Sequence, residues 1–120
     1  MNRIRYIQHN GNKILLQDFS GLVPGKELLA TLDEARTVVQ SQPPKSVVVL
    51  VDVTNMRFDK DSLDRMKELA ASNEPYVKAS TIVGIGGLLQ VGLVAISRFS
   101  GRNFRTFLTR EEALDWLSTQ

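Results

Sequence analysis

Cysteine is absent from the 120 residues, and histidine occurs once, as His9. Disulfides and thiol chemistry are therefore excluded, and a zinc site would have too few ligands. A chain without cysteine also fits the reducing environment of the cytoplasm, where we expect this protein to be located. No set of acid, base, nucleophile or metal ligand converges in the sequence, so we expect neither enzymatic activity nor a bound cofactor.

Long hydrophobic runs are missing as well. The longest apolar tract covers residues 82–96, and Gln90 and four glycines interrupt it. A membrane-spanning helix needs about 20 apolar residues, so we expect no segment to insert into a membrane. Residues 1–6 also lack the apolar stretch that is typical of a signal peptide.

Negative charge is missing from one part of the chain. The formal net charge is only +2, but residues 75–110 contain five cations and no acidic residue. A stretch of this kind can attract an anion. A domain dedicated to nucleic acid is usually basic throughout, so we expect no nucleic-acid partner.

What the chain does have is the composition of one globular domain, with 42% hydrophobic and 23% charged residues. Its N-terminal part predicts a β-hairpin, because Asn10-Gly11 lies between segments 4–9 and 13–18 and favours the positive φ angles of a tight turn. The short run 47–51 is apolar throughout. This pattern is typical of a parallel strand that is covered on both sides.

Alternating strand and helix signals follow along the rest of the chain. Asp59 is a typical N-cap residue, Gly101 is suited to end a helix, and Thr109 with Glu112 matches a capping box. We therefore predict a single α/β domain over residues 1–120, with an N-terminal hairpin, a mixed sheet and four helices in the order ββαβαβαβα. The expected strands are 4–9, 13–18, 47–51, 77–85 and 103–108, and the expected helices are 28–39, 59–73, one that runs through residue 99 and one that begins after residue 109.

The order of elements and the segment 51–63 resemble the STAS domain, the fold of the SpoIIAA-like anti-sigma-factor antagonists of bacteria and of the cytoplasmic tails of sulfate transporters. Val51-Asp52-Val53 and Phe58 match the strand and loop of the antagonists. Ser62 is the nearest counterpart of the serine that a partner kinase phosphorylates in them, although it comes slightly later and the glycine that follows is absent. Residues 76–87 and 107–117 are similar to a stand-alone bacterial subgroup of STAS-like proteins.

The resemblance implies a non-catalytic signalling module that acts through a protein partner, with Ser62 as the candidate phosphorylation site. The carboxyl end of a parallel strand is also where partners and ligands usually dock in α/β sheets. A structural role stays open as well, because Asp52 can cap the loop and Asp61 and Ser62 are common in a first helical turn. The candidate residues for this surface are Asp52, Thr54, Asn55, Phe58, Asp61 and Ser62.

A binding module for a small anionic or lipid-like ligand is the alternative. A glycine loop that opens a helix can hold an anion, and arginine forks suit phosphate or carboxylate. Close helix–strand packing also explains the glycines, and arginines at a helix C-terminus complement its dipole. The oligomeric state stays open, a homodimer included. The candidate anion-binding residues are Gly84, Gly86, Gly87, Arg98, Arg102 and Arg105.

Overall fold

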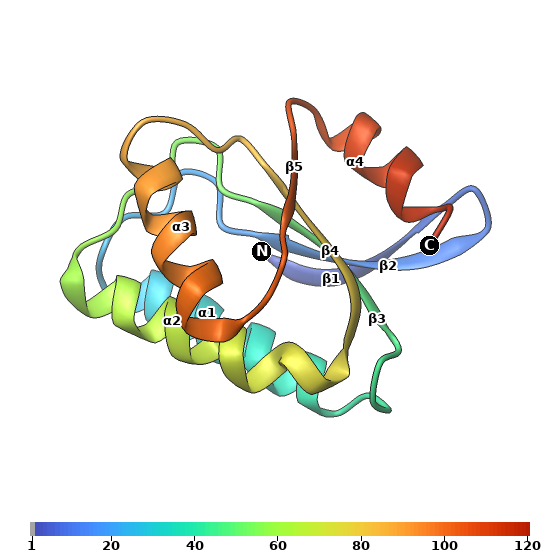
Figure 1. Cartoon of the computed structure of the whole chain (residues 1–120), viewed down its shortest axis with the longest axis horizontal. Coiled ribbons are helices and arrows are strands. Elements are labelled where there is room, and N and C mark those ends of the chain that lie inside the picture. Colours follow the sequence, from blue (N-terminus) through green and yellow to red (C-terminus); the bar gives the residue numbers. More distant parts are fainter. Residues whose placement is uncertain (1) are drawn as a thin grey trace.

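The computed structural model describes residues 2–120 and contains one mixed sheet with helices on both of its faces (Figure 1). The five strands lie in the order β1-β2-β3-β4-β5, which is also their order along the chain. The predicted α/β fold is therefore confirmed. The elements are β1 (Ile4–His9), β2 (Asn12–Asp18), α1 (Lys26–Gln40), β3 (Val47–Asp52), α2 (Lys60–Asn73), the 3-10 turn η1 (Glu74–Tyr76), β4 (Val77–Val83), α3 (Leu88–Ser100), β5 (Arg105–Phe107) and α4 (Arg110–Leu117).

β1 and β2 form an antiparallel hairpin at one edge of the sheet. Asn10 and Gly11 connect the two strands with φ angles of 50° and 78°. A type I′ turn requires positive φ at both of these positions. The predicted hairpin is therefore confirmed, and its two-residue turn sets a register in which His9 pairs with Asn12.

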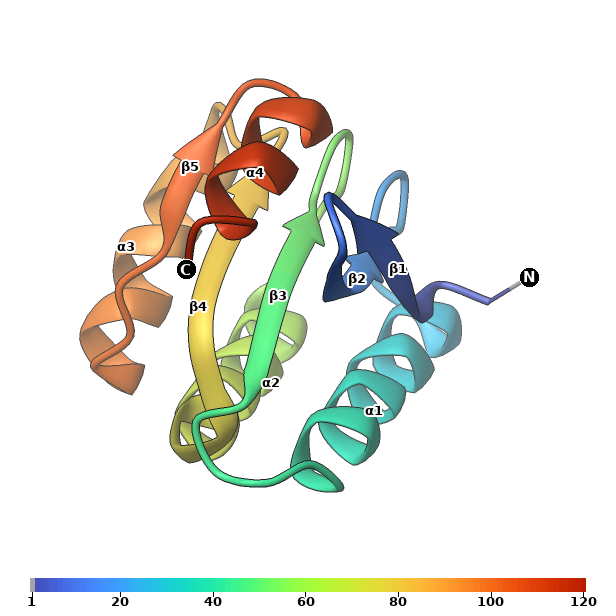
Figure 2. The same ribbon diagram turned by 90° about the vertical axis from the view of Figure 1, so that its right-hand side faces the viewer.

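β2, β3, β4 and β5 run parallel, and a helix connects each strand to the next. Right-handed crossovers that always extend the sheet in one direction leave their helices on one face. α1, α2 and α3 accordingly share a face, and α4 lies on the other one, over β3 and β4 (Figure 2). β3 and β4 are therefore covered on both sides, as the apolar run 47–51 predicted for β3.

The side chains of each strand alternate between two hydrophobic clusters. In β2, Leu15 points into the larger cluster, which lies between the sheet and α1, α2 and α3, whereas Ile14 and Leu16 point the other way. The smaller cluster is the core beneath α4. It consists of Ile14, Leu16, Leu50, Val83, Ala113 and Leu117.

Some boundaries differ from the prediction. β4 ends at Val83 instead of residue 85, because Gly84 has a φ of +85° and turns the chain. β5 begins only at Arg105, since Phe104 packs against the larger cluster before the chain joins the sheet. Trp116 is partly buried at the margin of the smaller cluster, where its ring centroid lies 6.0 Å from that of Phe107.

Candidate functional site

The two loops selected from the sequence meet at the carboxyl ends of β3 and β4. A Cβ atom on Gly84 would lie 2.7 Å from the Cα of Thr54, so the loops touch almost backbone to backbone. The structure thus brings two of the partner candidates, Asn55 and Phe58, and two of the glycine candidates, Gly84 and Gly86, together along one groove. This groove is lined by Asn55, Met56, Arg57, Phe58, Gly84, Gly86, Leu88 and Leu89.

The three candidate glycines have different structural roles. Close packing explains Gly84, but a Cβ on Gly86 or Gly87 would meet no atom within 4 Å. Gly87 has a φ of +55°, so its backbone conformation favours glycine before the first turn of α3. Nothing in the surroundings of Gly86 requires a glycine.

Asp52 is buried at the end of β3 and anchors both its own loop and α4. Its Oδ1 accepts hydrogen bonds from the backbone N–H and the hydroxyl of Thr54. Its Oδ2 accepts a hydrogen bond of 2.7 Å from Nε of Arg110, in the first turn of α4. Each carboxylate oxygen of Asp52 is therefore already engaged.

Asp18 ends β2 beside Asp52 and repeats the same arrangement. Its Oδ1 accepts hydrogen bonds from the N–H and hydroxyl of Ser20 and lies 3.6 Å from Nη2 of Arg110. Burial would raise the pKa of Asp18, but the bonds from Ser20 and the charges of Arg110 and Arg3 hold it below its ordinary value. Arg110 thus links the ends of two neighbouring strands to α4.

Ser62 forms a capping box with Asp59 at the start of α2. Its side chain is buried; its hydroxyl accepts from the N–H of Asp59 and lies 2.8 Å from the Asp59 carboxylate. The hydrogen bonds from Ser62 lower the pKa of Asp59. Asp61, on the same turn, is exposed. A kinase would therefore reach Ser62 only if the first turn of α2 opened.

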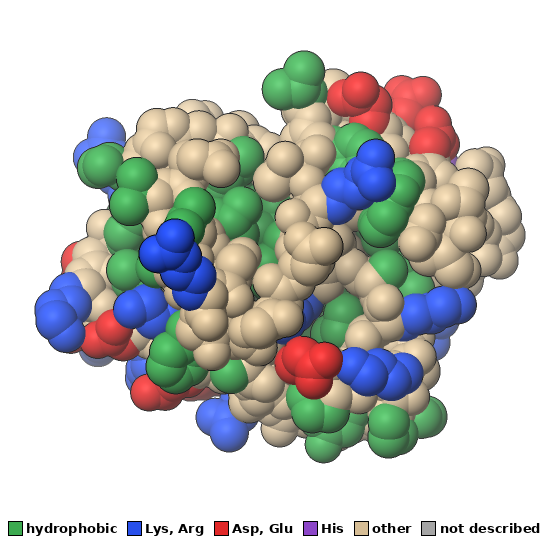
Figure 3. All heavy atoms as spheres, in the orientation of Figure 1, with side chains coloured by type: hydrophobic (Ala, Val, Ile, Leu, Met, Phe, Trp, Pro, Cys, Tyr) green, Lys and Arg blue, Asp and Glu red, His purple; other side chains and the backbone are tan. Residues whose placement is uncertain are grey.

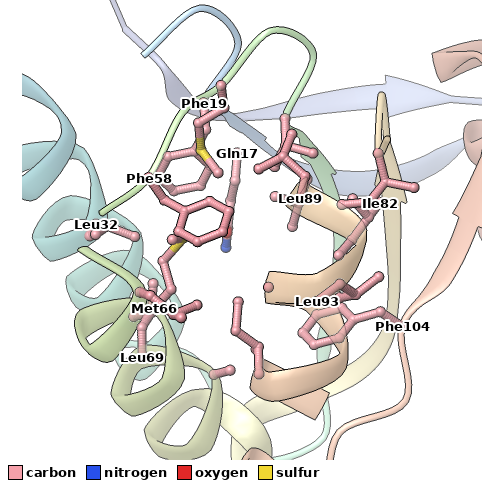
Figure 4. A pocket seen from close by; sticks show the side chains of 18 of the residues that line it. Gln17, Phe19, Leu32, Phe58, Met66, Leu69, Ile82, Leu89, Leu93 and Phe104 are labelled. Carbon is pink, nitrogen blue, oxygen red and sulfur yellow. The ribbon is translucent and has the colours of Figure 1, made fainter. Parts of the chain in front are cut away.

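Phe58 is partly buried and packs against α3. Position 92 of α3 is a glycine, and a Cβ there would lie 3.2 Å from the Phe58 ring. The absence of a side chain at Gly92 is what allows helix and ring to approach. Phe58 consequently lines a cavity beneath α3 (Figure 4).

The three candidate arginines point to different places. Arg98 is exposed in the last turn of α3. The guanidinium of Arg105 stacks on the ring of Trp116, which belongs to α4. Arg102 lies beneath α3 on the other face, where it donates a hydrogen bond to the hydroxyl of Ser80 on β4. The structure does not gather these three groups into one site, because the chain crosses the edge of the sheet between residues 102 and 105.

A cavity of about 90 Å³ lies between the sheet, α2 and α3. Met66 and Leu69 line it from α2, and Leu89 and Leu93 line it from α3 (Figure 4). One water molecule needs only about 10–15 Å³, and voids of larger size are few in a close-packed domain. Sequence reasoning missed this cavity. The available signal was α3 itself, which is apolar in composition although only Gly92 and Leu93 are buried in it.

Gln17 places a polar group at the sheet side of this cavity. The residue is 5% exposed, and its side chain points from β2 into the space between α2 and α3 (Figure 4). Its carboxamide forms no hydrogen bond with the part of the chain that the structure describes. No fully enclosed side-chain polar atom of residues 2–120 lacks a partner, so the carboxamide must border the cavity.

The outer face of α3, defined by Leu88, Val91, Val94 and Phe99, is exposed. Leu88 is 77% exposed and Val91 is 66% exposed, although both are large and apolar. Figure 3 shows hydrophobic side chains next to basic ones on the side of the molecule that carries this helix. α3 therefore presents apolar side chains both to the cavity and to solvent.

Within residues 2–120, no three His, Asp or Glu side chains lie close enough together to hold a metal ion. The histidine, His9, instead lies 2.7 Å from the carboxylate of Asp115 and ties α4 to the hairpin. No described helix has both the length and the apolar character that crossing a membrane requires.

A five-stranded mixed sheet with three crossover helices on one face and a terminal helix on the other defines a SpoIIAA-like fold. This fold is shown by a structural comparison, in which the chain superimposes on an uncharacterized protein of the DUF3478 family from Shewanella loihica PV-4, itself described as SpoIIAA-like. The TM-score is 0.72 at 18% sequence identity, with 95% of this chain and 91% of that chain covered. The sequence matches no family model and no curated protein.

Proposed function

We propose that this protein is a non-catalytic regulatory module of the cytoplasm that binds an apolar small molecule beneath α3. The observation that carries the proposal is the apolar cavity with the unpaired carboxamide of Gln17 at its margin. Small-molecule sites are usually apolar hollows in which a few polar groups fix the orientation of the ligand. The cavity has this composition.

Energetics favour a binding role over an accident of packing. A void in a core lowers stability in proportion to its volume, and a carboxamide that only a trapped water can pair with costs up to about 2 kcal/mol for immobilising that water. Two such costs in one place are hard to explain as structure alone. A ligand that fills the void and hydrogen bonds to Gln17 would offset both.

A neutral apolar dye, N-phenyl-1-naphthylamine, tests this proposal, because its fluorescence rises when it leaves water. We expect saturable binding to the wild-type protein. Ala70→Leu should weaken it at least tenfold, since Ala70 lines the cavity from α2 and the added atoms would fill it. Ala71→Leu is the matched control, because Ala71 lies next to it but does not line the cavity. No saturable binding, or an equal loss in both variants, would contradict the proposal.

A protein partner is the second candidate, and the exposed outer face of α3 favours it. Four apolar side chains on this face, next to a segment 75–110 that is purely basic in charge, suit a partner with apolar anchors inside an acidic rim. The groove beside Phe58 borders this face, because Leu88 belongs to both, and Leu63 in the first turn of α2 lies beside Gly92 of α3. Phosphorylation of Ser62 would add negative charge there and repel such a partner.

Affinity capture followed by mass spectrometry tests the second candidate when it is run on paired variants. Val91→Glu should lose a partner that Gln90→Glu retains, because both positions are exposed but only Val91 is apolar. Ser62→Glu should weaken the same capture. If Val91→Glu and Gln90→Glu capture the same proteins, or if α3 binds anionic lipid vesicles instead, the outer face of α3 is not a protein-docking surface.

A further inference from the structure

Arg102 is a cation beneath α3 that no acidic side chain of residues 2–120 pairs with. Its guanidinium donates to the hydroxyl of Ser80 at 2.5 Å and to the backbone carbonyl of Ala70 at 3.4 Å. It also lies over the ring of Phe104, 4.4 Å from the ring centroid. All three contacts are with neutral groups.

Arg110, on the opposite face of the sheet, is an arginine whose charge is paired with carboxylates. Its guanidinium lies 2.7 Å from the carboxylate of Asp52 and 3.6 Å from that of Asp18. The acidic residue that acts on Arg102 is Glu74, whose carboxylate is held 2.8 Å from Nζ of Lys45. Arg102 therefore lacks the counter-ion that partly buried arginines usually have.

Arg102 nevertheless keeps its charge in neutral solution. Burial lowers the pKa of Arg102 to about 10, and Glu74 opposes this effect. A guanidinium also has more N–H donors than the two hydrogen bonds above use. A positive charge with spare donors therefore borders a cavity whose other lining is apolar apart from Gln17 and Asn73.

We propose that the ligand of this cavity is an apolar carboxylic acid, whose carboxylate pairs with Arg102 and whose hydrocarbon part lies between α2 and α3. This inference rests on the proposed ligand-binding function and specifies the chemical class of the ligand. The planar guanidinium fork matches a carboxylate in shape, and the pair replaces a missing counter-ion. The apolar lining excludes acids that are polar throughout.

The register of the sheet gives the direction of such a ligand. Gln17 and Ser80 lie two strands apart and two residues apart in register, since Leu15 aligns with Val49 and Val49 aligns with Ser80. Two strand spacings correspond to about 10 Å, and two residues to about 7 Å along the strands. A chain that starts at Arg102 therefore runs diagonally across the sheet toward the carboxamide of Gln17.

Matched pairs of probes test the inference on the wild-type protein. Straight-chain acids of four to ten carbons are compared with the alcohols of equal length, as competitors of N-phenyl-1-naphthylamine at pH 7. At the length that fits, the acid should bind at least about tenfold more tightly than the alcohol, the difference expected for one charged hydrogen-bonded pair.

Variants then test whether Arg102 is the source of the preference for the acid over the alcohol. Arg102→Gln should abolish the advantage of the acid and leave the affinity for the alcohol within about twofold. Arg98→Gln removes the same charge from an exposed position and should leave the advantage intact. If dye and alcohols bind but acids bind no better, the ligand-binding function stands and this inference fails. If the advantage survives in Arg102→Gln or is lost in Arg98→Gln, Arg102 is not the carboxylate partner.

Discussion

One face of the sheet is covered by a single helix of eight residues, α4, and the other by three longer helices. The two faces differ in how their polar groups are paired. On the face covered by α4, six apolar side chains form a buried cluster, and side chains of α4 pair with the strand ends and the hairpin: Arg110 with Asp52 and Asp18, and Asp115 with His9. The face with the larger cover has a cavity, the unpaired Gln17 and the unpaired Arg102.

Under the proposed function, the difference separates a structural face from a ligand-binding face. In a region with a purely structural role, side chains are closely packed and polar groups have hydrogen-bond or ion-pair partners. Polar groups without a partner are expected where a ligand binds. The α4 face therefore holds the sheet together, and the α3 face is where ligand binding would occur. Each prediction that follows compares the two faces.

The largest effect is expected from truncating leucines. Leu50→Ala, beneath α4, should lower the free energy of unfolding by about 4 kcal/mol, because it opens a void in a closed core. Leu93→Ala should cost about 2 kcal/mol, since it only enlarges an existing cavity. Chemical denaturation measures both values. Equal losses would mean that the α3 face is packed as tightly as the other.

The two arginines should respond in opposite ways. Arg110→Met leaves the buried carboxylate of Asp52 without its cation and should cost about 2 kcal/mol, a value reduced by the partial exposure of Arg110. Arg102→Met removes an unpaired charge and should leave stability unchanged or raised. Thermal melts of the two variants in parallel test this contrast. A large loss with Arg102→Met would show that its neutral contacts stabilise the fold.

Acid should weaken the α4 face. The pKa of Asp18 is lowered in the folded protein, so its contribution to stability is fully present above its unfolded value near about 4 and is lost as the pH falls through the folded pKa. Asp18→Asn should therefore lower stability at pH 7 by about 1.5 kcal/mol and flatten the acid limb of the stability curve. Urea unfolding of the wild-type protein and of Asp18→Asn between pH 2 and pH 7 measures this difference in the free energy of unfolding. An unchanged acid limb would mean that Asp18 is not one of the titrating groups.

The smallest effect is expected at Gln17. Gln17→Leu replaces the unpaired carboxamide by an apolar side chain of similar size and should raise stability by up to about 1 kcal/mol. Leu16→Gln, one residue away, places a carboxamide in the closed core beneath α4 and should be strongly destabilising. Denaturation of both variants compares the faces at adjacent positions. A loss of stability in Gln17→Leu would indicate that the carboxamide has a structural partner.

Most of the fold could be predicted because its signals are local. The hairpin follows from Asn10-Gly11, the start of α2 from Asp59, and the start of α4 from the box between Thr109 and Glu112. Each of these residues acts through its own backbone or one a few positions away. Local interactions of this kind can be recognised from a single sequence.

The cavity could not be predicted, because its polar residues are distant in sequence and have no local pattern. Gln17 reads as an ordinary polar residue at the end of a strand, and only the parallel pairing with β3 turns it toward α3. Arg102 was grouped with Arg98 and Arg105 because they are close in sequence, and the path of the chain around the sheet edge separates them. The position of Phe58 likewise depends on its contact with Gly92, which the sequence does not reveal.

The contact between the two loops at the carboxyl edge constrains how this sequence can evolve. Position 84 has no room for a side chain because Thr54 occupies the space, whereas position 86, two residues later, opens into free space. In a library that samples all amino acids at both positions, folded variants should retain glycine at 84 and accept many residues at 86. Adaptation of the groove to a new ligand or partner would therefore proceed through positions such as 86, with the junction of Gly84 and Thr54 held constant.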